Sequence, residues 1–576
     1  MSFIVLSERL ASKQRYFRLI AIICLTYLVI QWFYIAFAIF TLDDFWLAYH
    51  ANHYKTGLPY RDFAPYKSVL GYYVFLVPLS LFHGVLSPLV YTKAWIALLN
   101  TVFLCGISLW LKKFFSAKAI LTTLVLIIST PLFLLFSSEI RVDLLAYWLC
   151  LICVLFLFEK NYFLAGVSIG LGFLISQKVV LYFIATNCGL IGCWLVNERT
   201  WSMVKHIFSF NAGTLLMLCL YITFWSYYSS VHTVLWSLFY EPYLLYVVDW
   251  YVQLRGLFWR FIIYNSIELV LLWPLALIGL IILPAKNRTF ILIYSVVILF
   301  FMVTTKQPFG YFPLMAVPAL FVLFSSFFSA LDSHIYASMH MGKGSKTLYN
   351  WVVFSTLLLI VIWPLSRFIS NLPGYDGRYQ KSMIHLMAQL LSDGGSYIAG
   401  VPLLLDIEQP IPGLIHLVGP AIDYMSHPSK ELHSVLSLRS MYLTPVTAPG
   451  LIDAIQSAPI KLYVDNNRFH FTPNELRRYL DTQYQHFWGS IYLYAPQVPA
   501  GHQKIKIKFS GNYQVNANAV VSIDNKNVAP QTIIHLAHRD YVSDARISYR
   551  LTLVPDHVQH FLEPRYKENH WNVLLP

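Results

Sequence analysis

Long apolar stretches separated by short polar segments dominate the first 370 residues of the chain. An α-helix needs about 17 to 25 such residues to cross a bilayer, so the pattern predicts a bundle of membrane-spanning helices. The stretches lie near residues 19–40, 88–111, 119–136, 143–158, 161–176, 179–196, 207–228, 263–284, 289–304, 308–331 and 349–369. We expect the first stretch to be retained, because no cleavage pattern of small residues follows it.

The apolar segment VLGYYVFLVPLSLF at 69–82 needs separate treatment. If it crossed the membrane, Lys112, Lys113 and Lys118 would lie outside, and every later basic loop would also change sides. Lysine and arginine gather in cytoplasmic loops, so we expect 69–82 to be a juxtamembrane helix at the outer interface. This assignment gives about eleven crossings, with the amino terminus inside and everything after residue 370 outside.

The chain changes character after LPGYDG at 372–377, a Pro/Gly break typical of a domain boundary. Beyond it, YQKSMIHLMAQLLSDGG has helical spacing, SYIAGVPLLLD and IKLYVDNN read as buried strands, and KIKIKFSGNYQVNANAVVSIDNKNV alternates with period two. We therefore expect a polytopic α-helical membrane domain over 1–370, with an outer loop at 41–87. A soluble α/β domain that ends in a β-rich part is expected over 371–576.

The composition agrees with a membrane protein, since 57% of the residues are hydrophobic and only 12% are charged. The seven cysteines fall in apolar stretches, so no disulfide framework is expected. The net charge of +13 comes from short basic clusters beside the apolar stretches. That distribution is typical of cytoplasmic loops and argues against a nucleic-acid partner.

Candidate chemistry begins in the outer loop DDFWLAYHANHYKTGLPYRDFAPYK, at 43–67. Asp43 and Asp44 follow the first apolar stretch directly, and ionisable groups at a membrane edge are costly unless they are hydrated, paired or used. A carboxylate there can act as the general base of a group transfer. The alternative is helix N-capping or interface anchoring.

Further charges are expected on the same outer face. The short turn SEIRVD contains Glu139, Arg141 and Asp143, which by themselves would also suit a solvated hairpin with an internal ion pair. The cations expected beside these acids are Lys67, Lys178 and Lys306, whereas Lys93 is expected to snorkel to the interface. Cations beside carboxylates at one depth predict a site for the phosphate of a lipid.

A metal site is weakly supported. His50 and His53 are three residues apart and could share a helix face with Asp43, but no third ligand is fixed. Interfacial packing or hydrogen bonding is the favoured interpretation, and we expect no cofactor.

Five segments resemble the polytopic glycosyltransferases of the C superfold, in the branch that contains protein O-mannosyltransferases and the aminoarabinose transferase of lipid A. The resemblance covers roughly 41–330, and its order and spacing support it. The segments are DDFWLAYH, TGLPYRDFAPYKSVLGYYVFLVPLSLFHG, RVD, AGVSIGLGFLISQK and GYFPLMAVPALFVL.

The resemblance implies a transferase that moves a hexose or pentose from a polyprenyl-phosphate donor to an acceptor on the outer face, with inversion. The family's base carries over to Asp43, and its later aspartate to Asp143. The neighbour of the base is usually Glu, where this chain has Asp44.

The family's phosphate-binding lysines carry over to Lys67 and Lys178, with Arg141 and Lys306 as further candidates. In the aminoarabinose enzymes a Glu precedes the loop lysine, but here that residue is Tyr66, which argues against a metal site like theirs. Candidates for acceptor or interface contacts are Tyr60, Asp62, Tyr66 and Glu139.

Three other functions stay open. A transporter or flippase would place charges near mid-membrane and show symmetry between its halves, whereas the charges here gather at one face and no repeat is present. A polysaccharide polymerase or ligase would also act on lipid-linked glycans outside, and the outer domain could serve a non-catalytic scaffold. The expected partners are the donor, the membrane, and a lipid, polysaccharide or protein acceptor. The expected location is a bacterial inner membrane, with the active site and carboxy-terminal domain in the periplasm.

Overall fold

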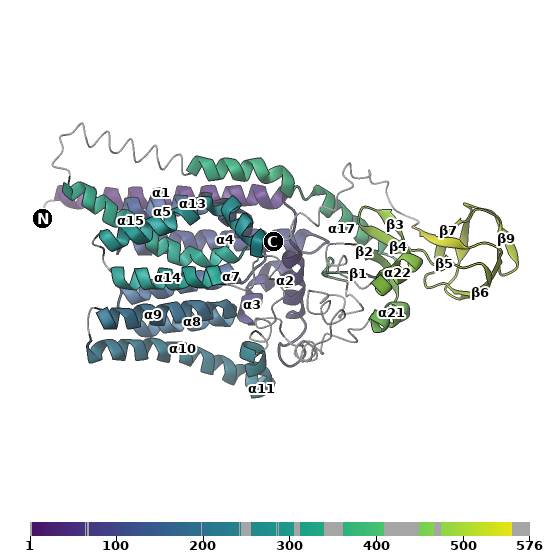
Figure 1. Cartoon of the computed structure of the whole chain (residues 1–576), viewed down its shortest axis with the longest axis horizontal. Helices are drawn as coiled ribbons and strands as arrows, with labels where there is room; N and C mark the ends of the chain where they lie inside the picture. Colours follow the sequence, from purple (N-terminus) through teal and green to yellow (C-terminus); the bar gives the residue numbers. More distant parts are fainter. Residues whose placement is uncertain are drawn as a thin grey trace.

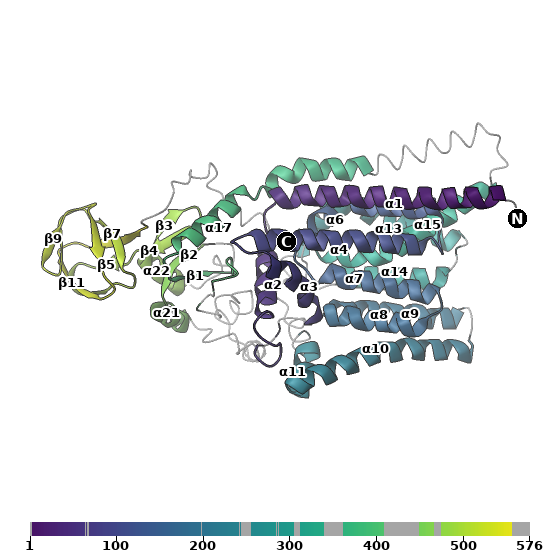
Figure 2. The same cartoon turned by 180° about the vertical axis from the view of Figure 1, so that it is seen from behind.

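The computed structural model describes residues 3–63, 65, 68–196, 199–240, 242, 255–283, 285, 287–304, 311–338, 361–407, 410, 448–465 and 474–555. Three of the predicted site residues, Tyr66, Lys67 and Lys306, lie outside these ranges. The molecule is elongated, with a bundle of long helices at one end and the β-strands at the other (Figure 1). The amino terminus lies at the end of the bundle far from the strands in both views (Figures 1 and 2).

The bundle is built from apolar helices that run back and forth along its length (Figures 1 and 2). With the short helical segments that connect or extend them, they are α1 (Phe3–Phe37), α4 (Ser87–Leu111), α5 (Ala117–Ser129), α6 (Pro131–Phe136), α7 (Asp143–Phe158), α8 (Tyr162–Ile175), η1 (Gln177–Val179), α9 (Val180–Val196), α10 (Trp201–Tyr228), α11 (Val231–Leu235), η2 (Trp236–Tyr240), α13 (Arg255–Ile282), α14 (Arg288–Thr304), η4 (Phe312–Ala316) and α15 (Val317–Ser338). A further helix covers 361–371.

Within the described part of the chain, five helical segments are long and apolar enough to cross a membrane. They are Gln14–Phe37, Ser87–Leu111, Gln177–Val196, Trp201–Tyr228 and Phe312–His334. Several shorter apolar helices, among them α7, α8 and α14, accompany them in the bundle. A membrane-embedded helical fold is therefore confirmed, whereas the number of crossings stays a prediction.

Two short helices, α2 (Leu42–His53) and α3 (Leu70–Leu81), lie at the end of the bundle that faces the strands (Figure 2). Each has 12 residues, or about 18 Å at 1.5 Å per residue, well short of a hydrocarbon core of about 30 Å. The segment 69–82 thus forms a helix too short to cross by itself, as the charge pattern predicts.

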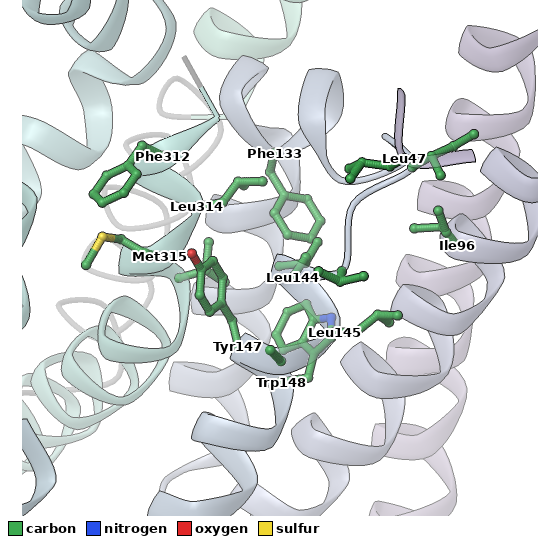
Figure 3. Close-up of a cluster of buried hydrophobic side chains, with 14 of the residues drawn as sticks. Leu47, Ile96, Phe133, Leu144, Leu145, Tyr147, Trp148, Phe312, Leu314 and Met315 are labelled. Atoms are coloured by element: carbon green, nitrogen blue, oxygen red, sulfur yellow. The ribbon is translucent and has the colours of Figure 1, made fainter. Parts of the chain in front are cut away.

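Large side chains pack the interior directly beneath this end of the bundle (Figure 3). Phe133 and Trp148 are almost fully buried and meet edge to face, with ring centroids 6.3 Å apart. Tyr147, Leu314 and Met315 belong to the same core. Buried aromatic rings contribute large apolar areas, so this packing stabilises the positions of α6, α7 and η4 relative to one another.

Beyond the bundle, a mixed sheet has strand order β1-β2-β4-β3, in which β1 and β2 are parallel and the other pairs antiparallel. Its elements are α17 (Arg378–Leu390), β1 (Ser396–Ala399), α21 (Ala448–Ser457), β2 (Ile460–Val464), α22 (Asn474–Gln483), β3 (Tyr484–Trp488) and β4 (Ile491–Tyr494). Alternate residues of β2 join different cores: Leu462 packs with α17 and the bundle, and Tyr463 packs with α21 and α22. Helices on both faces explain why every residue of β1 and β2 is buried.

The chain then forms two antiparallel four-stranded sheets, of order β10-β7-β12-β5 and β6-β11-β8-β9. The strands are β5 (Gln497–Val498), β6 (Gly501–Lys506), β7 (Gly511–Asn516), β8 (Val521–Ile523), β9 (Lys526–Val528), β10 (Ile533–Leu536), β11 (Asp540–Ala545) and β12 (Tyr549–Val554). Tyr513 and Val515 of β7 are buried, whereas their neighbours are partly exposed. This is the half-buried alternation expected from the sequence.

The bundle and α17 are joined just after the carboxy-terminal end of α1. Phe40 N–H donates to Gln380 Oε1 (2.7 Å), and Gln380 Nε2 donates back to Phe40 O (2.8 Å). Gly377 packs so closely that a Cβ there would lie 2.5 Å from the Ala38 carbonyl oxygen. A larger residue at 377 would therefore force the two segments apart.

The predicted orientation can be tested with cysteines placed at exposed positions in loops at opposite ends of the bundle. His83, between α3 and α4, and Thr200, before α10, are both exposed. We expect a membrane-impermeant thiol reagent to label His83→Cys in intact cells, and Thr200→Cys only after permeabilisation. The unaltered chain, whose seven cysteines lie in bundle helices, is the control for background labelling. The opposite pattern would invert the topology.

Candidate active site

The acidic pair lies in the first turn of α2, where Thr41 caps the helix. Thr41 Oγ1 accepts from the Asp44 N–H (3.1 Å), and Asp44 Oδ2 accepts from the Thr41 N–H (2.8 Å), which completes a capping box. Such a box satisfies backbone donors that a helix start leaves without partners. The two aspartates are thereby held at the helix start, but their side chains face different surroundings.

Asp44 is fully buried, and its carboxylate joins three segments. Besides the Thr41 N–H, Lys93 Nζ from α4 donates to Oδ2 (2.9 Å), and the Ile140 N–H donates to Oδ1 (2.7 Å). The Lys93 side chain is only 3% exposed, so the expectation that Lys93 snorkels to the interface was wrong. Because a buried carboxylate needs a nearby cation and hydrogen-bond donors, Lys93 compensates Asp44 inside the protein.

Asp43, by contrast, is reachable from solvent, with 34% of its side chain exposed. It forms an ion pair with Arg141 Nη2, which arrives from the turn between α6 and α7. Arg141 Nε also donates to Glu139 Oε2 (2.5 Å). The Arg141 guanidinium is therefore shared by two acids, one exposed and one buried, and it fixes the orientation of the exposed one.

Glu139 is buried, with 3% of its side chain exposed. Burial raises the pKa of Glu139 to about 7, against a lowering contribution from Arg141. The predicted SEIRVD ion pair exists, but the turn is buried instead of solvated, since Ser138, Ile140 and Val142 are also inaccessible.

Hydrogen bonds to Ser137, the residue before the SEIRVD turn, hold this turn in place. Trp148 Nε1 donates to Asn100 Oδ1 (2.7 Å), and Asn100 Nδ2 donates to the Ser137 carbonyl (2.5 Å). Tyr27 OH donates to Ser137 Oγ (2.7 Å), which adds a contact from α1. Satisfied buried polar groups of this kind rigidify the segment that carries Arg141.

A second cluster lies at the start of α7. Lys178 Nζ donates to Asp143 Oδ2 (2.8 Å), and Ser176 Oγ donates to Asp143 Oδ1 (2.6 Å). The Asp143 side chain is 5% exposed, whereas the Lys178 side chain is 20% exposed. Because both oxygens of Asp143 accept hydrogen bonds, its geometry suits holding Lys178 better than removing a proton.

Tyr311 connects the two clusters. The Arg141 guanidinium carbon lies 3.2 Å from the centroid of the Tyr311 ring, and Lys178 Nζ lies 4.6 Å from it. The negative face of an aromatic ring attracts cations, so Tyr311 keeps both cations near one point. Sequence reasoning missed Tyr311, although it belongs to the segment GYFPLMAVPALFVL, and it also missed Ser176, which directly precedes Gln177 and Lys178.

The remaining described candidates lie apart from these contacts. Tyr60 is buried against α10, where its hydroxyl lies 2.7 Å from the Tyr221 hydroxyl. Asp62 pairs with its neighbour Arg61 and accepts from the Leu58 N–H (2.8 Å), so it shapes the loop. Neither is brought to Arg141 by a contact that the structure records.

The predicted histidine pair lies on α2, with ring centroids 6.3 Å apart. His53 Nδ1 lies 3.0 Å from the Tyr49 carbonyl oxygen, as expected for a hydrogen-bonded helical residue. Among the described residues, no three His, Cys, Asp or Glu side chains are grouped so as to hold a metal ion.

An apolar cavity of about 390 Å³ lies between α3, α8 and α10. Its lining includes Leu70, Tyr73, Leu174, Tyr221 and Trp225. Leu174 precedes Ser176 by two residues, so the cavity is close along the chain to the residues that hold Lys178.

Comparison with protein-family profiles and with curated protein sequences finds no match for this chain. Solved structures do resemble it. ArnT from Cupriavidus metallidurans bound to undecaprenyl phosphate gives a TM-score of 0.52 at 13% identity, and its apo state gives 0.55 at 12%. Both comparisons cover 78% of this chain and 93% of the other. The resemblance inferred from the sequence is thus confirmed for the fold.

Removing Lys93 tests whether the buried ion pair holds this end of the bundle together. Lys93→Met would leave Asp44 buried without its cation. We therefore expect the free energy of unfolding in detergent to fall by roughly 3–5 kcal/mol. The matched change Lys113→Met breaks an ion pair with Glu159 in which the lysine side chain is 63% exposed. It should lower the free energy of unfolding by less than about 1 kcal/mol.

The double variant Lys93→Met/Asp44→Asn removes both charges and should recover part of the loss. Equal effects of Lys93→Met and Lys113→Met on the free energy of unfolding would show that the Asp44 pair is not a structural constraint.

Proposed function

We propose that the chain is a glycosyltransferase that moves a sugar from a polyprenyl-phosphate donor to an acceptor at the outer surface of the membrane. The observation that carries the proposal is that Arg141 and Lys178 both lie against the Tyr311 ring, with Asp43 paired to Arg141, at one end of the helical bundle. The shared fold with ArnT, one of whose structures holds undecaprenyl phosphate, supports it. By this analogy the membrane is a bacterial inner membrane and the site faces the periplasm.

In this proposal Asp43 is the general base. It is the most exposed carboxylate of the two clusters, at 34% against 5% or less for Asp44, Glu139 and Asp143. A base must approach the proton that it removes, and exposure meets that requirement. Asp44 and Asp143 then act as positioning residues, one for the helix start and the other for Lys178.

The reaction is a single displacement at the anomeric carbon. The acceptor oxygen or nitrogen bonds to that carbon while its proton passes to the Asp43 carboxylate. The bond from the anomeric carbon to the phosphate oxygen breaks, and the electron pair leaves with polyprenyl phosphate. Attack opposite the leaving group inverts the anomeric configuration.

Lys178 and Arg141 would stabilise the departing phosphate. Preorganised cations are effective where charge develops in a site that excludes bulk water. The apolar cavity near Leu174 suits the first isoprene units of the donor, because it adjoins the segment that carries Lys178. A lipid-linked donor also accounts for a base held at the membrane edge, since the sugar of such a donor cannot leave the interface.

The transporter alternative fits less well. The ion pairs of Asp43, Asp44 and Asp143 lie at the starts of α2 and α7, at one end of the bundle, whereas a transport pathway needs ionisable groups near the membrane midplane. A polymerase or ligase of lipid-linked glycans uses the same chemistry, and the acceptor distinguishes it.

Replacing the base provides a test in cells. Cells lacking the gene receive the unaltered chain, Asp43→Asn, or the control Asp524→Asn, and mass spectrometry follows sugar addition to envelope lipids, polysaccharides and proteins. Asn keeps the size of Asp but cannot accept the proton, so we expect the transfer rate of Asp43→Asn to fall by roughly 10²–10⁴-fold. Asp524 is also arginine-paired and 31% exposed, but it lies on the outer β-sheets, so its variant should transfer normally. Undiminished transfer by Asp43→Asn would remove the base from this assignment.

Donor binding provides a separate test of the cation. Lys178→Met should weaken binding of undecaprenyl phosphate by the purified protein by roughly 1.5–3 kcal/mol, the size of one charge-assisted contact. The control is Lys461→Met, which breaks a Lys–Asp pair with Asp393 in the outer domain and should leave the affinity unchanged. If the two variants bind alike, the phosphate site lies elsewhere.

A further inference from the structure

A second cavity, of about 520 Å³, lies where α1, α4 and α17 meet. Its lining includes Ala36 at the outer end of α1, Leu86, Val90 and Tyr91 at the start of α4, and Lys381 and His385 on α17. These residues differ from those of the two acidic clusters and from the lining of the cavity near Leu174. The proposed reaction makes no use of this cavity.

One wall of the cavity is cationic. Lys381 and His385 are four residues apart, so both side chains lie on one face of α17. Lys381 Nζ donates to the Ala36 carbonyl (2.6 Å), and no carboxylate of the described residues lies within ion-pair distance of it. The nearby Asp376 is paired with Arg378. No acidic side chain lines the cavity, so its positive charge is not balanced there.

The other lining residues are mostly apolar and come from α1, α4 and the segment between α3 and α4. α1 and α4 are two of the helices long enough to cross the membrane, and the cavity lies at their outer ends. Phe33 and Phe37 on α1 are 65% and 62% exposed, and Tyr91 stacks on Phe82 with ring centroids 3.7 Å apart. The cavity therefore lies where the hydrocarbon core gives way to the headgroup region.

We propose that this cavity binds the phosphate of an anionic bilayer phospholipid, whose acyl chains lie along α1 and α4. Lys381 provides a charge-assisted contact to a phosphate oxygen, and the His385 imidazole provides a second donor. The exposed aromatic rings of α1 and α4 cover the upper part of the acyl chains. Burial lowers the pKa of the Lys381 ammonium and Lys93 adds to this effect, whereas Asp376 acts in the opposite direction, so a bound anion would offset part of an existing cost.

This lipid would lie near the Asp44–Lys93 pair. Lys381 Nζ lies 5.6 Å from the centroid of the Phe40 ring, and Lys93 Nζ lies 5.5 Å from the same ring. Phe40 thus adjoins both the phospholipid cavity and the Asp44–Lys93 pair. Because Gln380 next to Lys381 forms paired hydrogen bonds with Phe40, the bound lipid would stabilise the junction between α17 and the segment leading into α2.

Lipid binding to the full-length protein can be measured by native mass spectrometry. The probes are dioleoyl phosphatidylglycerol, which is anionic, and dioleoyl phosphatidylcholine, which has the same chains and no net charge. We expect tighter binding of phosphatidylglycerol, weakened about tenfold or more by Lys381→Gln/His385→Gln. The control Arg378→Gln removes a cation from the same helix, but an exposed one paired with Asp376, and should change the affinity less than about twofold.

Three results would overturn the proposal. Equal binding of the two lipids would show that charge is not recognised, and an equal loss in Arg378→Gln would indicate surface charge without a built site. Displacement of phosphatidylglycerol by equimolar soluble glycerol phosphate would show that the acyl chains contribute nothing. A melting temperature of the double variant within about 1 °C of wild type confirms that lost binding does not reflect unfolding. If that variant unfolds, Lys381→Gln alone replaces it. None of these results depends on sugar transfer, so the lipid site and the proposed reaction can fail independently.

Discussion

The buried carboxylate of Asp44 is the constraint on which the end of the bundle that faces the strands depends. It accepts hydrogen bonds from the Thr41 N–H, the Lys93 ammonium and the Ile140 N–H. One side chain therefore joins the start of α2, the first half of α4 and the turn before α7. An ionised group in this position is tolerated only when its partners are close and correctly oriented. The three segments therefore have little freedom to shift separately.

The neighbouring residues take their positions from this arrangement. Asp43 follows the same helix start but points to a surface where 34% of its side chain is exposed. Arg141 is presented to it by the SEIRVD turn, which also contains Ile140, and that turn is further held by Asn100 and Tyr27 through Ser137. The proposed base is thus placed by contacts that have no part in the proposed reaction. Such support is what keeps a site preorganised.

Much of the architecture follows from local patterns. Long apolar runs predict the bundle, the charge pattern separates the short helix at 69–82 from the crossings, and period-two alternation predicts strands such as β7. These signals succeed because they depend on residues close in sequence. The positions of the Asp43, Asp143 and Lys178 side chains at one end of the bundle also agree with the charge pattern.

The pairings inside the site could not be predicted in the same way. Lys93 meets Asp44 across 49 residues, and Ile140 meets it across 96, so the choice of Lys93 over another cation is made by tertiary packing. Sequence alone presents Asp43 and Asp44 as equivalent acids, whereas packing buries one and exposes the other. Tyr311 carries no charge, so nothing in its local pattern indicates that two cations would lie against its ring.

The most direct test of the central claim is turnover by the purified protein in lipid vesicles supplied with a polyprenyl-phosphate-linked sugar and an envelope extract as acceptor. The account predicts protein-dependent release of free polyprenyl phosphate, with one sugar transferred per phosphate released and the anomeric configuration inverted by NMR. Movement of the intact donor between leaflets, with no polyprenyl phosphate released, would contradict it.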